Sequence, residues 1–418
     1  MNRPQNAISR IRAKTASILA EFTLIRLIGL AADPPVAYNM AVKIPRIVQK
    51  TIEQRLSASN KVVIIYGPRQ VGKTTLAMDI IANWRGRVLE ISADEPRYID
   101  VLSSRDSAKL KSLVAGYDLL FIDEAQRVPD IGINLKILHD QSPDLRTLVT
   151  GSSSFDLAKS VREALTGRAW TYNLYPIAYM ELSGVYNNFE LDAQLDQRLV
   201  YGSYPELFSI PNQADKEDYL YEIGNAYLYK DILELSSIRD SSKIRDLVRL
   251  LAYQVGSEVS RSELGTALGM SKDTVGSYID LLEKSFVVFR LSGYSRNLRK
   301  EVTRNDRIYF YDLGIRNMVL DNFKPVGRRD DVGALWENFL IAERMKKLAY
   351  TRTHAQTYFW RTYTGAELDY IEHREGSLFG YEFKFGSKTA KCPATWSQAY
   401  PDSKCELVNR TNYLDFVL

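Results

Sequence analysis

Short apolar runs of strand length recur through the first half of the chain. They lie at residues 61–66, 88–92, 119–122 and 147–150, and a further strand is expected at residues 170–174. Apolar runs of this length are typical of parallel strands that are buried on both faces. The pattern therefore predicts an α/β fold built around a parallel sheet.

The middle of the chain changes to helical spacing, from about residue 215 to residue 283. Within it, Ser260 precedes Glu263 by three positions, which is the capping-box spacing at a helix start. Gly269 permits a sharp turn, and Ser271 is placed to begin a second helix. This spacing predicts a helix-turn-helix.

Two further apolar strands, residues 287–291 and 307–311, follow the helix pair and predict a winged helix. The second helix of the pair mixes acidic and basic residues and lacks the arginines that recognise guanine. Winged helices also bind proteins, so DNA and protein both stay open as partners. The connection between the two strands carries four basic residues suited to phosphate contact, Arg296, Arg299, Lys300 and Arg304.

A glycine-rich segment joins the first strand to a helical stretch that starts at about Thr75. This is the phosphate-binding loop pattern in its strand–loop–helix context. Backbone N–H groups and the helix N-terminus are expected to face phosphates. Lys73 is expected to reach the β- and γ-phosphates, and the Thr74 hydroxyl to ligate Mg²⁺. ATP and Mg²⁺ are thus the expected cofactors, and the expected phosphate cradle comprises Gly67, Pro68, Arg69, Gln70, Val71, Gly72, Lys73, Thr74 and Thr75.

The third apolar run ends in two carboxylates, at the sheet edge where ligands bind. We expect Asp123 to hold Mg²⁺ through water and Glu124 to polarise the attacking water. Gln126 is a weaker candidate for orienting water or phosphate. Ser152 or Ser153, after the fourth run, is placed either to sense the γ-phosphate or to cap a helix.

These motifs resemble the AAA+ and archaeal-type ATPases of the P-loop superfamily. More closely, residues 40–418 resemble prokaryotic ATP-binding proteins that fuse such a module to a nuclease-like C-terminal domain of unknown function. The resemblance implies a homo-oligomer in which an arginine before the fifth strand acts on a neighbour's nucleotide. Arg168 occupies that place, with Arg162 nearby, although pairing with a carboxylate is the alternative for Arg168. Residues 201–206 resemble a family motif for which the sequence offers no chemistry beyond a turn.

A second set of charged residues lies in the C-terminal region. Glu337 begins an amphipathic helix, Asp369 lies on a strand, and Glu382 and Lys384 share one face of the next strand. This order is that of PD-(D/E)xK nucleases, in which the three carboxylates would bind Mg²⁺. Lys384 would then lower the pKa of the attacking water or stabilise the phosphate. The alternative is a nuclease fold kept for binding or dimerisation without catalysis.

Composition limits the protein class. Of 418 residues, 45% are hydrophobic and 25% are charged, which is ordinary for a globular protein. The net charge of +4 excludes a histone-like protein, so any nucleic-acid surface must be a local patch. Two cysteines, Cys392 and Cys405, are too few for a disulfide framework and suit a reducing cytoplasm. No apolar run reaches the length of a membrane span.

We expect four regions. They are an N-terminal extension (1–39), an AAA+-like P-loop ATPase domain (40–214), a helical and winged-helix domain (215–325) and a PD-(D/E)xK nuclease-like domain (326–418). The extension is basic, and a transit peptide or a docking helix are its alternatives. The expected function is ATP hydrolysis by a DNA-associated cytoplasmic protein. The alternative is a nucleotide-dependent signalling switch that binds protein partners and cleaves no nucleic acid.

Overall fold

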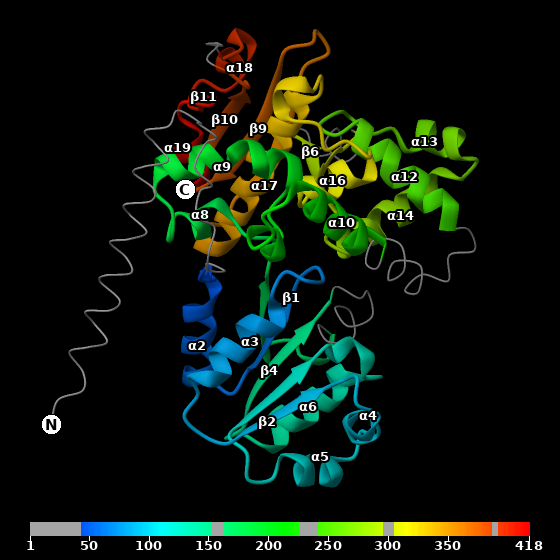
Figure 1. The fold of residues 1–418 in the computed structure, drawn as a ribbon, viewed down its shortest axis with the longest axis vertical. Helices are drawn as coiled ribbons and strands as arrows, with labels where there is room; N and C mark the ends of the chain where they lie inside the picture. Colours follow the sequence, from blue (N-terminus) through cyan, green and yellow to red (C-terminus); the bar gives the residue numbers. More distant parts are fainter. Residues whose placement is uncertain (1–42, 153–162, 226–240, 296–304, 387–391) are drawn as a thin grey trace, which may run out of the picture. The chain divides into compact units, whose positions relative to one another are not determined.

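The fold is known from a computed structural model. It describes residues 43–152, 163–225, 241–295, 305–386 and 392–418. The chain divides into residues 1–41 and a compact unit of residues 42–418, which contains two β-sheets (Figure 1). Several residues singled out above lie outside the described residues, namely the 1–39 extension, Ser153, Arg162, Arg296, Arg299, Lys300 and Arg304.

The first sheet is parallel, and its described strands lie in the order β2-β3-β4-β1-β5. All five predicted strands are present, which confirms the α/β fold with a parallel sheet. The strands are β1 (Val62–Tyr66), β2 (Val88–Ser92), β3 (Leu119–Asp123), β4 (Arg146–Gly151) and β5 (Ala169–Asn173).

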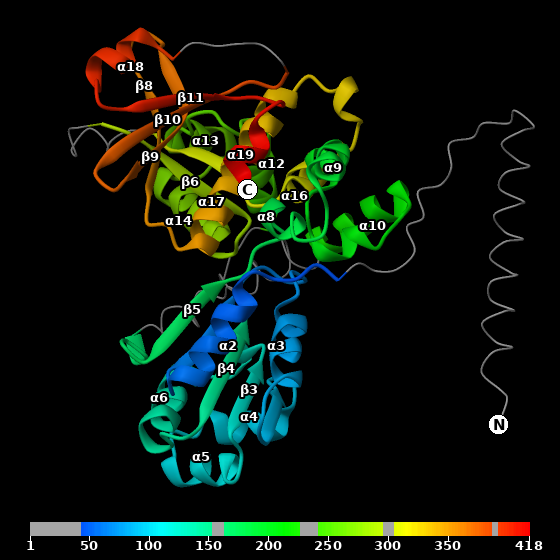
Figure 2. The same ribbon diagram turned by 90° about the vertical axis from the view of Figure 1, so that its left-hand side faces the viewer.

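Helices cover both faces of this sheet, because alternate strand residues point to opposite sides. Val63 and Ile65 pack with one helix group, whereas Val62 and Ile64 pack with the other. Figure 2 shows the helices around the strands of this sheet. The first group comprises α2 (Val48–Ala58) and α3 (Lys73–Ala82), and the second comprises α4 (Pro96–Leu102), α5 (Ser107–Val114) and α6 (Ile131–Gln141). Both faces of β1 are therefore buried, as its continuous apolar sequence requires.

A helical region follows the first sheet. Within it, the Ser260 side chain accepts a hydrogen bond from the Glu263 backbone N–H at 3.3 Å, which supplies half of the predicted capping box. Gly269 ends α13 in the left-handed conformation, and Ser271 caps α14. The predicted helix pair with its turn is therefore present. The helices are α8 (Tyr179–Leu182), α9 (Asn188–Tyr201), α10 (Gln213–Ile223), α12 (Ser241–Tyr253), α13 (Arg261–Leu268), α14 (Lys272–Lys284) and α16 (Leu313–Val319).

The second sheet has the strand order β11-β10-β9-β8-β6-β7 among the described residues. Strands β6 and β7, which follow the helix pair, are antiparallel, and β6 also pairs with β8. The sheet therefore joins strands from both sides of residue 325, which the sequence pattern assigns to separate domains. The strands are β6 (Val288–Gly293), β7 (Arg307–Phe310), β8 (Gln356–Arg361), β9 (Glu367–Arg374), β10 (Ser377–Phe383) and β11 (Lys404–Val408).

Three further helices lie in the described C-terminal part, and short 3-10 turns occur at several points of the described chain. The helices are α17 (Val332–Thr351), α18 (Ala394–Ala399) and α19 (Tyr413–Val417), and the 3-10 turns along the chain are η1 (Ala125–Arg127), η2 (Pro205–Phe208) and η4 (Val326–Arg328). None of the helices within the described ranges is long and apolar enough to cross a membrane.

The two cysteines form a disulfide, which the cysteine count alone did not anticipate. Cys392 precedes α18 and Cys405 lies on β11, with their Cα atoms 6.2 Å apart. A low cysteine count excludes a framework of several bridges, but it does not exclude one bridge between residues that the fold brings together. Since disulfides persist mainly in oxidising surroundings, the cysteines no longer support a reducing compartment.

Candidate functional site

The glycine-rich loop connects β1 directly to α3, which begins at Lys73, two residues before the predicted start. The backbone of a neighbouring segment lies so close to the first glycine of the loop, Gly67, that no larger residue fits at this position. A Cβ atom at Gly67 would lie 2.2 Å from the Leu174 carbonyl oxygen, so only glycine fits there. The loop is thus held against the segment that follows β5.

Lys73 points into this loop. Its side chain is almost fully buried, and its Nζ donates hydrogen bonds to the carbonyl oxygens of Gly67 at 3.1 Å and Pro68 at 2.8 Å. A buried ammonium inside a glycine-rich loop suits an anionic ligand, because burial strengthens the attraction between opposite charges. The position fits the expected contact with nucleotide phosphates.

The first two expected Mg²⁺ ligands meet across the sheet edge. The Thr74 hydroxyl donates to both carboxylate oxygens of Asp123, at 3.1 and 3.0 Å. The Thr150 hydroxyl also donates to Asp123. Strand β4 lies between β1 and β3, so the three strands end at one edge and bring these groups together. A hydroxyl beside a carboxylate is an oxygen donor set that Mg²⁺ accepts, and the residues therefore fit that cation.

Glu124 is held by two neighbours. It has the left-handed backbone conformation, and its N–H donates to the Thr150 hydroxyl at 3.2 Å. The Gln126 amide nitrogen donates to the Glu124 carboxylate, while the Gln126 oxygen accepts from the Ser152 N–H at 3.2 Å. Gln126, a weaker candidate by sequence, thus links the expected general base to the expected phosphate sensor.

Arg168 lies at the opposite edge of the sheet from the phosphate loop. Its carbonyl oxygen accepts from the N–H of Val62, the first residue of β1, at 2.9 Å. A five-residue strand spans roughly 16 Å, so its side chain does not belong to the loop of its own chain. The Arg168 Nε donates to Asp140 at 2.8 Å, and this bond lowers the pKa of Asp140 to about 2. The pairing that sequence analysis left open for Arg168 is therefore present within one chain.

Sequence reasoning missed Arg46, which connects the phosphate loop to α17. Arg46 donates to the carbonyl oxygens of Val71 at 2.7 Å and Tyr175 at 2.6 Å. It also contacts the Glu181 carboxylate at 3.0 Å and the Tyr350 hydroxyl at 3.3 Å. Nothing local to residue 46 marks this role, since the partners lie up to 304 positions away along the chain.

The C-terminal carboxylates surround an arginine that sequence analysis gave no role. Arg307 is buried at 4% exposure, and its guanidinium lies 3.4 Å from Glu337, 2.9 Å from Glu367 and 4.0 Å from Asp369. The Tyr309 hydroxyl donates to Glu337 at 2.6 Å. A guanidinium therefore lies among the carboxylates, in the region where a divalent cation was expected.

The remaining two residues of the expected nuclease site pair with each other. The Lys384 Nζ contacts Glu382 at 2.6 Å, and this bond raises the pKa of Lys384 although burial opposes the shift. The Phe383 N–H donates to Asp369 at 2.7 Å. Burial, reinforced by the nearby glutamates, raises the pKa of Asp369 well above its ordinary value. A lysine with a raised pKa stays charged, which both roles expected of Lys384 require.

The structure thus brings the predicted C-terminal residues to one region without forming a metal site. No three His, Cys, Asp or Glu side chains in the described part of the chain are arranged to hold a metal ion. The physical reason is that Arg307 and Lys384 already contact the carboxylates. The Mg²⁺ site expected at Glu337, Asp369 and Glu382 therefore stays a prediction.

Comparison with known families shows what the first domain resembles. Residues 59–183 match the family described as AAA domain. This region is similar to AAA domains, and residues 59–183 are called the AAA domain below. The match supports nucleotide binding and ATPase function for the AAA domain, in agreement with the phosphate loop and the parallel sheet. Residues 192–325 and 332–413 match two domains of unknown function, DUF8612 and DUF4143.

Full-length relatives extend the similarity beyond the AAA domain. An uncharacterized protein of Mycobacterium tuberculosis is 29% identical over 369 residues, which cover 84% of this chain and 80% of that protein. One from Methanocaldococcus jannaschii is 24% identical over 387 residues, covering 87% and 84%. Among solved structures, a Walker-type ATPase of Pyrococcus abyssi is 13% identical, covers 65% of this chain and 94% of that one, and has a TM-score of 0.43.

Proposed function

We propose that this protein is a Mg²⁺-dependent, ATP-hydrolysing AAA+-like protein of the cytoplasm that associates with DNA and acts as a homo-oligomer. The observation that carries the ATPase proposal is the convergence of buried Lys73 with the Thr74–Asp123 pair at one sheet edge. The Cys392–Cys405 bridge does not favour the cytoplasm. The proposal of a cytoplasmic location therefore rests on the ATPase class alone.

The chain supplies the steps of hydrolysis from this edge. Thr74 and Asp123 would hold Mg²⁺, which when bound neutralises charge on the β- and γ-phosphates. The loop N–H groups and Lys73 orient the phosphates, and Glu124 accepts a proton from the attacking water. Gln126 fixes the Glu124 carboxylate in place, and the Ser152 N–H donates a hydrogen bond to Gln126. Arg168 would contribute its charge to the site of a neighbouring subunit.

The remaining regions are proposed as binding modules. Residues 215–325 would form a helical and winged-helix domain, residues 326–418 a PD-(D/E)xK nuclease-like domain, residues 40–214 the ATPase domain and residues 1–39 an extension. The Arg307 contacts with Glu337 and Asp369 support a nuclease-like fold that is retained for binding. DNA would meet the wing and the C-terminal domain.

One observation favours the second candidate, a nucleotide-dependent switch for protein partners. Arg46 contacts both the phosphate loop and Tyr350 of α17, so a change in the loop has a direct route to the C-terminal part. The two candidates share the ATPase site and differ in the partner. Only the DNA-associated candidate predicts that nucleic acid alters hydrolysis.

The decisive experiment is steady-state ATP hydrolysis by the full chain, with and without single- and double-stranded DNA, across a salt series. We expect DNA to stimulate the rate, with an apparent DNA affinity that falls steeply as salt rises. A rate unaffected by DNA at low salt would favour the switch, and a rate equal to that of Lys73→Ala would refute the ATPase. Incubation of DNA with the full chain and Mg²⁺ or Mn²⁺ should leave the DNA intact. Metal-dependent cleavage by the wild type that is lost in Asp369→Ala would instead support the nuclease hypothesis.

A further inference from the structure

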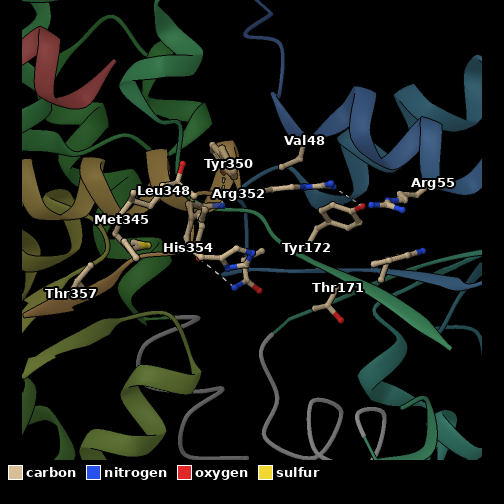
Figure 3. A pocket seen from close by; sticks show the side chains of 16 residues that line it. Val48, Arg55, Thr171, Tyr172, Met345, Leu348, Tyr350, Arg352, His354 and Thr357 are labelled. Atoms are coloured by element: carbon tan, nitrogen blue, oxygen red, sulfur yellow. Dashed lines mark hydrogen bonds between the residues drawn. The ribbon is translucent and has the colours of Figure 1, made fainter. Parts of the chain in front are cut away.

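A cavity of about 550 Å³ lies beside β5 (Figure 3). Its walls come from α2, β5, the end of α17 and the start of β8. Neither Lys73, Asp123 nor Glu124 lines it, and the Arg307 cluster does not contribute. The volume falls within the roughly 300–1,000 Å³ that is usual for small-ligand sites. The cavity is therefore a separate candidate binding site.

One wall combines arginines with aromatic rings. The Arg55 guanidinium lies over the Trp170 ring at 4.0 Å, and Arg352 lies over the Tyr172 ring at 5.8 Å. Trp170 and Tyr172 are two positions apart on β5 and so share a face of the strand. The Tyr172 hydroxyl accepts a hydrogen bond from Arg352 at 3.2 Å, a contact drawn in Figure 3. A guanidinium stacked on a ring keeps N–H donors in its plane, where phosphate oxygens accept them.

The opposite wall is apolar, because Met345, Leu348 and Ala349 of α17 line it. No aspartate or glutamate is among the described lining residues, so the charge at the cavity is positive. The Trp170 indole N–H is buried and has no hydrogen-bond partner among the described residues. A buried donor without an acceptor is costly, and an acceptor on a ligand would satisfy it.

We propose that this cavity binds a nucleotide unit, with its phosphate at Arg55 and Arg352 and its base against the apolar wall of α17. The unit is supplied either by a single-stranded nucleic acid or by a free nucleotide. The site does not require ATP hydrolysis at the phosphate loop. It extends the proposed association with nucleic acid to a surface formed by the AAA domain and α17.

Occupation of the cavity has a short route to the phosphate loop. Tyr175 and Tyr350 line the cavity, and both accept a hydrogen bond from Arg46. Arg46 in turn holds the Val71 carbonyl of the loop. A ligand that shifts either tyrosine therefore changes the contacts that anchor the loop.

The test measures equilibrium binding of three probes to the full-length chain: a labelled oligothymidylate, thymidine monophosphate and oligoglutamate. The Lys73→Ala background keeps the phosphate loop from contributing, so failure of the ATPase proposal does not affect the result. Arg352→Ala and Arg55→Ala should each weaken nucleotide binding about tenfold or more, because a charge-assisted hydrogen bond is lost. Arg97→Ala is the matched control, since Arg97 also lies over a tyrosine ring, at 4.6 Å from Tyr98, but outside the cavity.

The probes separate the sources of the nucleotide unit. Tight oligothymidylate binding with weak monophosphate binding supports a nucleic-acid strand, and equal affinities support a free nucleotide. The proposal is overturned if neither nucleotide probe binds, if oligoglutamate binds as tightly, or if Arg97→Ala weakens binding as much as Arg352→Ala. Each variant should unfold at the same denaturant concentration as the background. If Arg352→Ala does not fold, Tyr172→Phe removes only the hydroxyl that accepts from Arg352 and should weaken binding in the same direction.

Discussion

Replacement of Arg46 by alanine tests whether the phosphate loop depends on a contact from outside its motif. We expect Arg46→Ala to lower the free energy of unfolding by about 3 kcal/mol. We also expect ATP to bind about tenfold more weakly, because the Val71 carbonyl loses the donor that anchors it. The catalytic residues themselves are untouched by this change.

The magnitude follows from burial. The Arg46 side chain is 9% exposed and its partner Glu181 is 0% exposed, so removal of the arginine leaves a buried carboxylate without its counter-charge. Loss of one partner from a buried pair costs about 3–5 kcal/mol. The lower value applies because Glu181 keeps hydrogen bonds from the N–H groups of Ile47 at 3.2 Å and Ala178 at 3.0 Å.

Denaturant unfolding of wild type, Arg46→Ala, Glu181→Gln and the double variant would measure the coupling between the two residues. Lys43→Ala is the matched control, because Lys43 pairs with Asp79 with its own side chain 70% exposed. That substitution should cost less than about 1 kcal/mol. If Arg46→Ala unfolds within about 1 kcal/mol of wild type and binds ATP equally well, the anchoring role is wrong.

Three further outcomes are expected. Lys73→Ala should abolish measurable ATP binding, whereas Glu124→Gln should keep ATP bound and slow hydrolysis by about a hundredfold or more, because only proton transfer is lost; equal turnover by Glu124→Gln and wild type would remove the general-base assignment. If Arg168 acts on a neighbour, hydrolysis per subunit should rise with protein concentration, and a mixture of Arg168→Ala and Glu124→Gln subunits should regain activity; a concentration-independent rate would contradict this. The Arg168–Asp140 bond stabilises the fold at pH values above the ordinary aspartate pKa. This stabilisation is lost as pH falls from about 4 to the folded-state pKa of about 2. An NMR titration of Arg168→Ala should therefore show the pKa of Asp140 rising toward its ordinary value, and an unchanged titration would mean that the two side chains do not pair in solution.

Local sequence pattern determined the framework of the AAA domain. The apolar runs specified five strands because a strand buried on both faces needs a continuous apolar sequence. The phosphate loop was recognisable because strand, glycines, lysine and threonine all lie between Val62 and Thr74, so their spacing alone conveys the geometry. The helix pair of α13 and α14 was predictable for the same reason, since Ser260, Gly269 and Ser271 act on their immediate neighbours.

A motif without evident chemistry gained a physical explanation only from the fold. Within residues 201–206, Gly202 has φ of 76°, and a Cβ atom there would lie 2.0 Å from an Asp312 carboxylate oxygen. Asp312 also accepts from the Ser203 N–H at 2.7 Å. The glycine is required because a residue more than a hundred positions later packs against its backbone, and no local pattern conveys that contact.

Tertiary structure alone decided the electrostatics of the sites. Sequence spacing gathered Glu337, Asp369 and Glu382 correctly, since alternation along strands and helix position are local properties. It could not show that Arg307, from a strand assigned to another domain, lies between the carboxylates. The contacts of Arg46 could not be predicted for the same reason, because its partners are distant in the sequence. The sequence specifies which charges a segment carries. Only the packing of distant segments decides which opposite charges lie next to them in the folded protein.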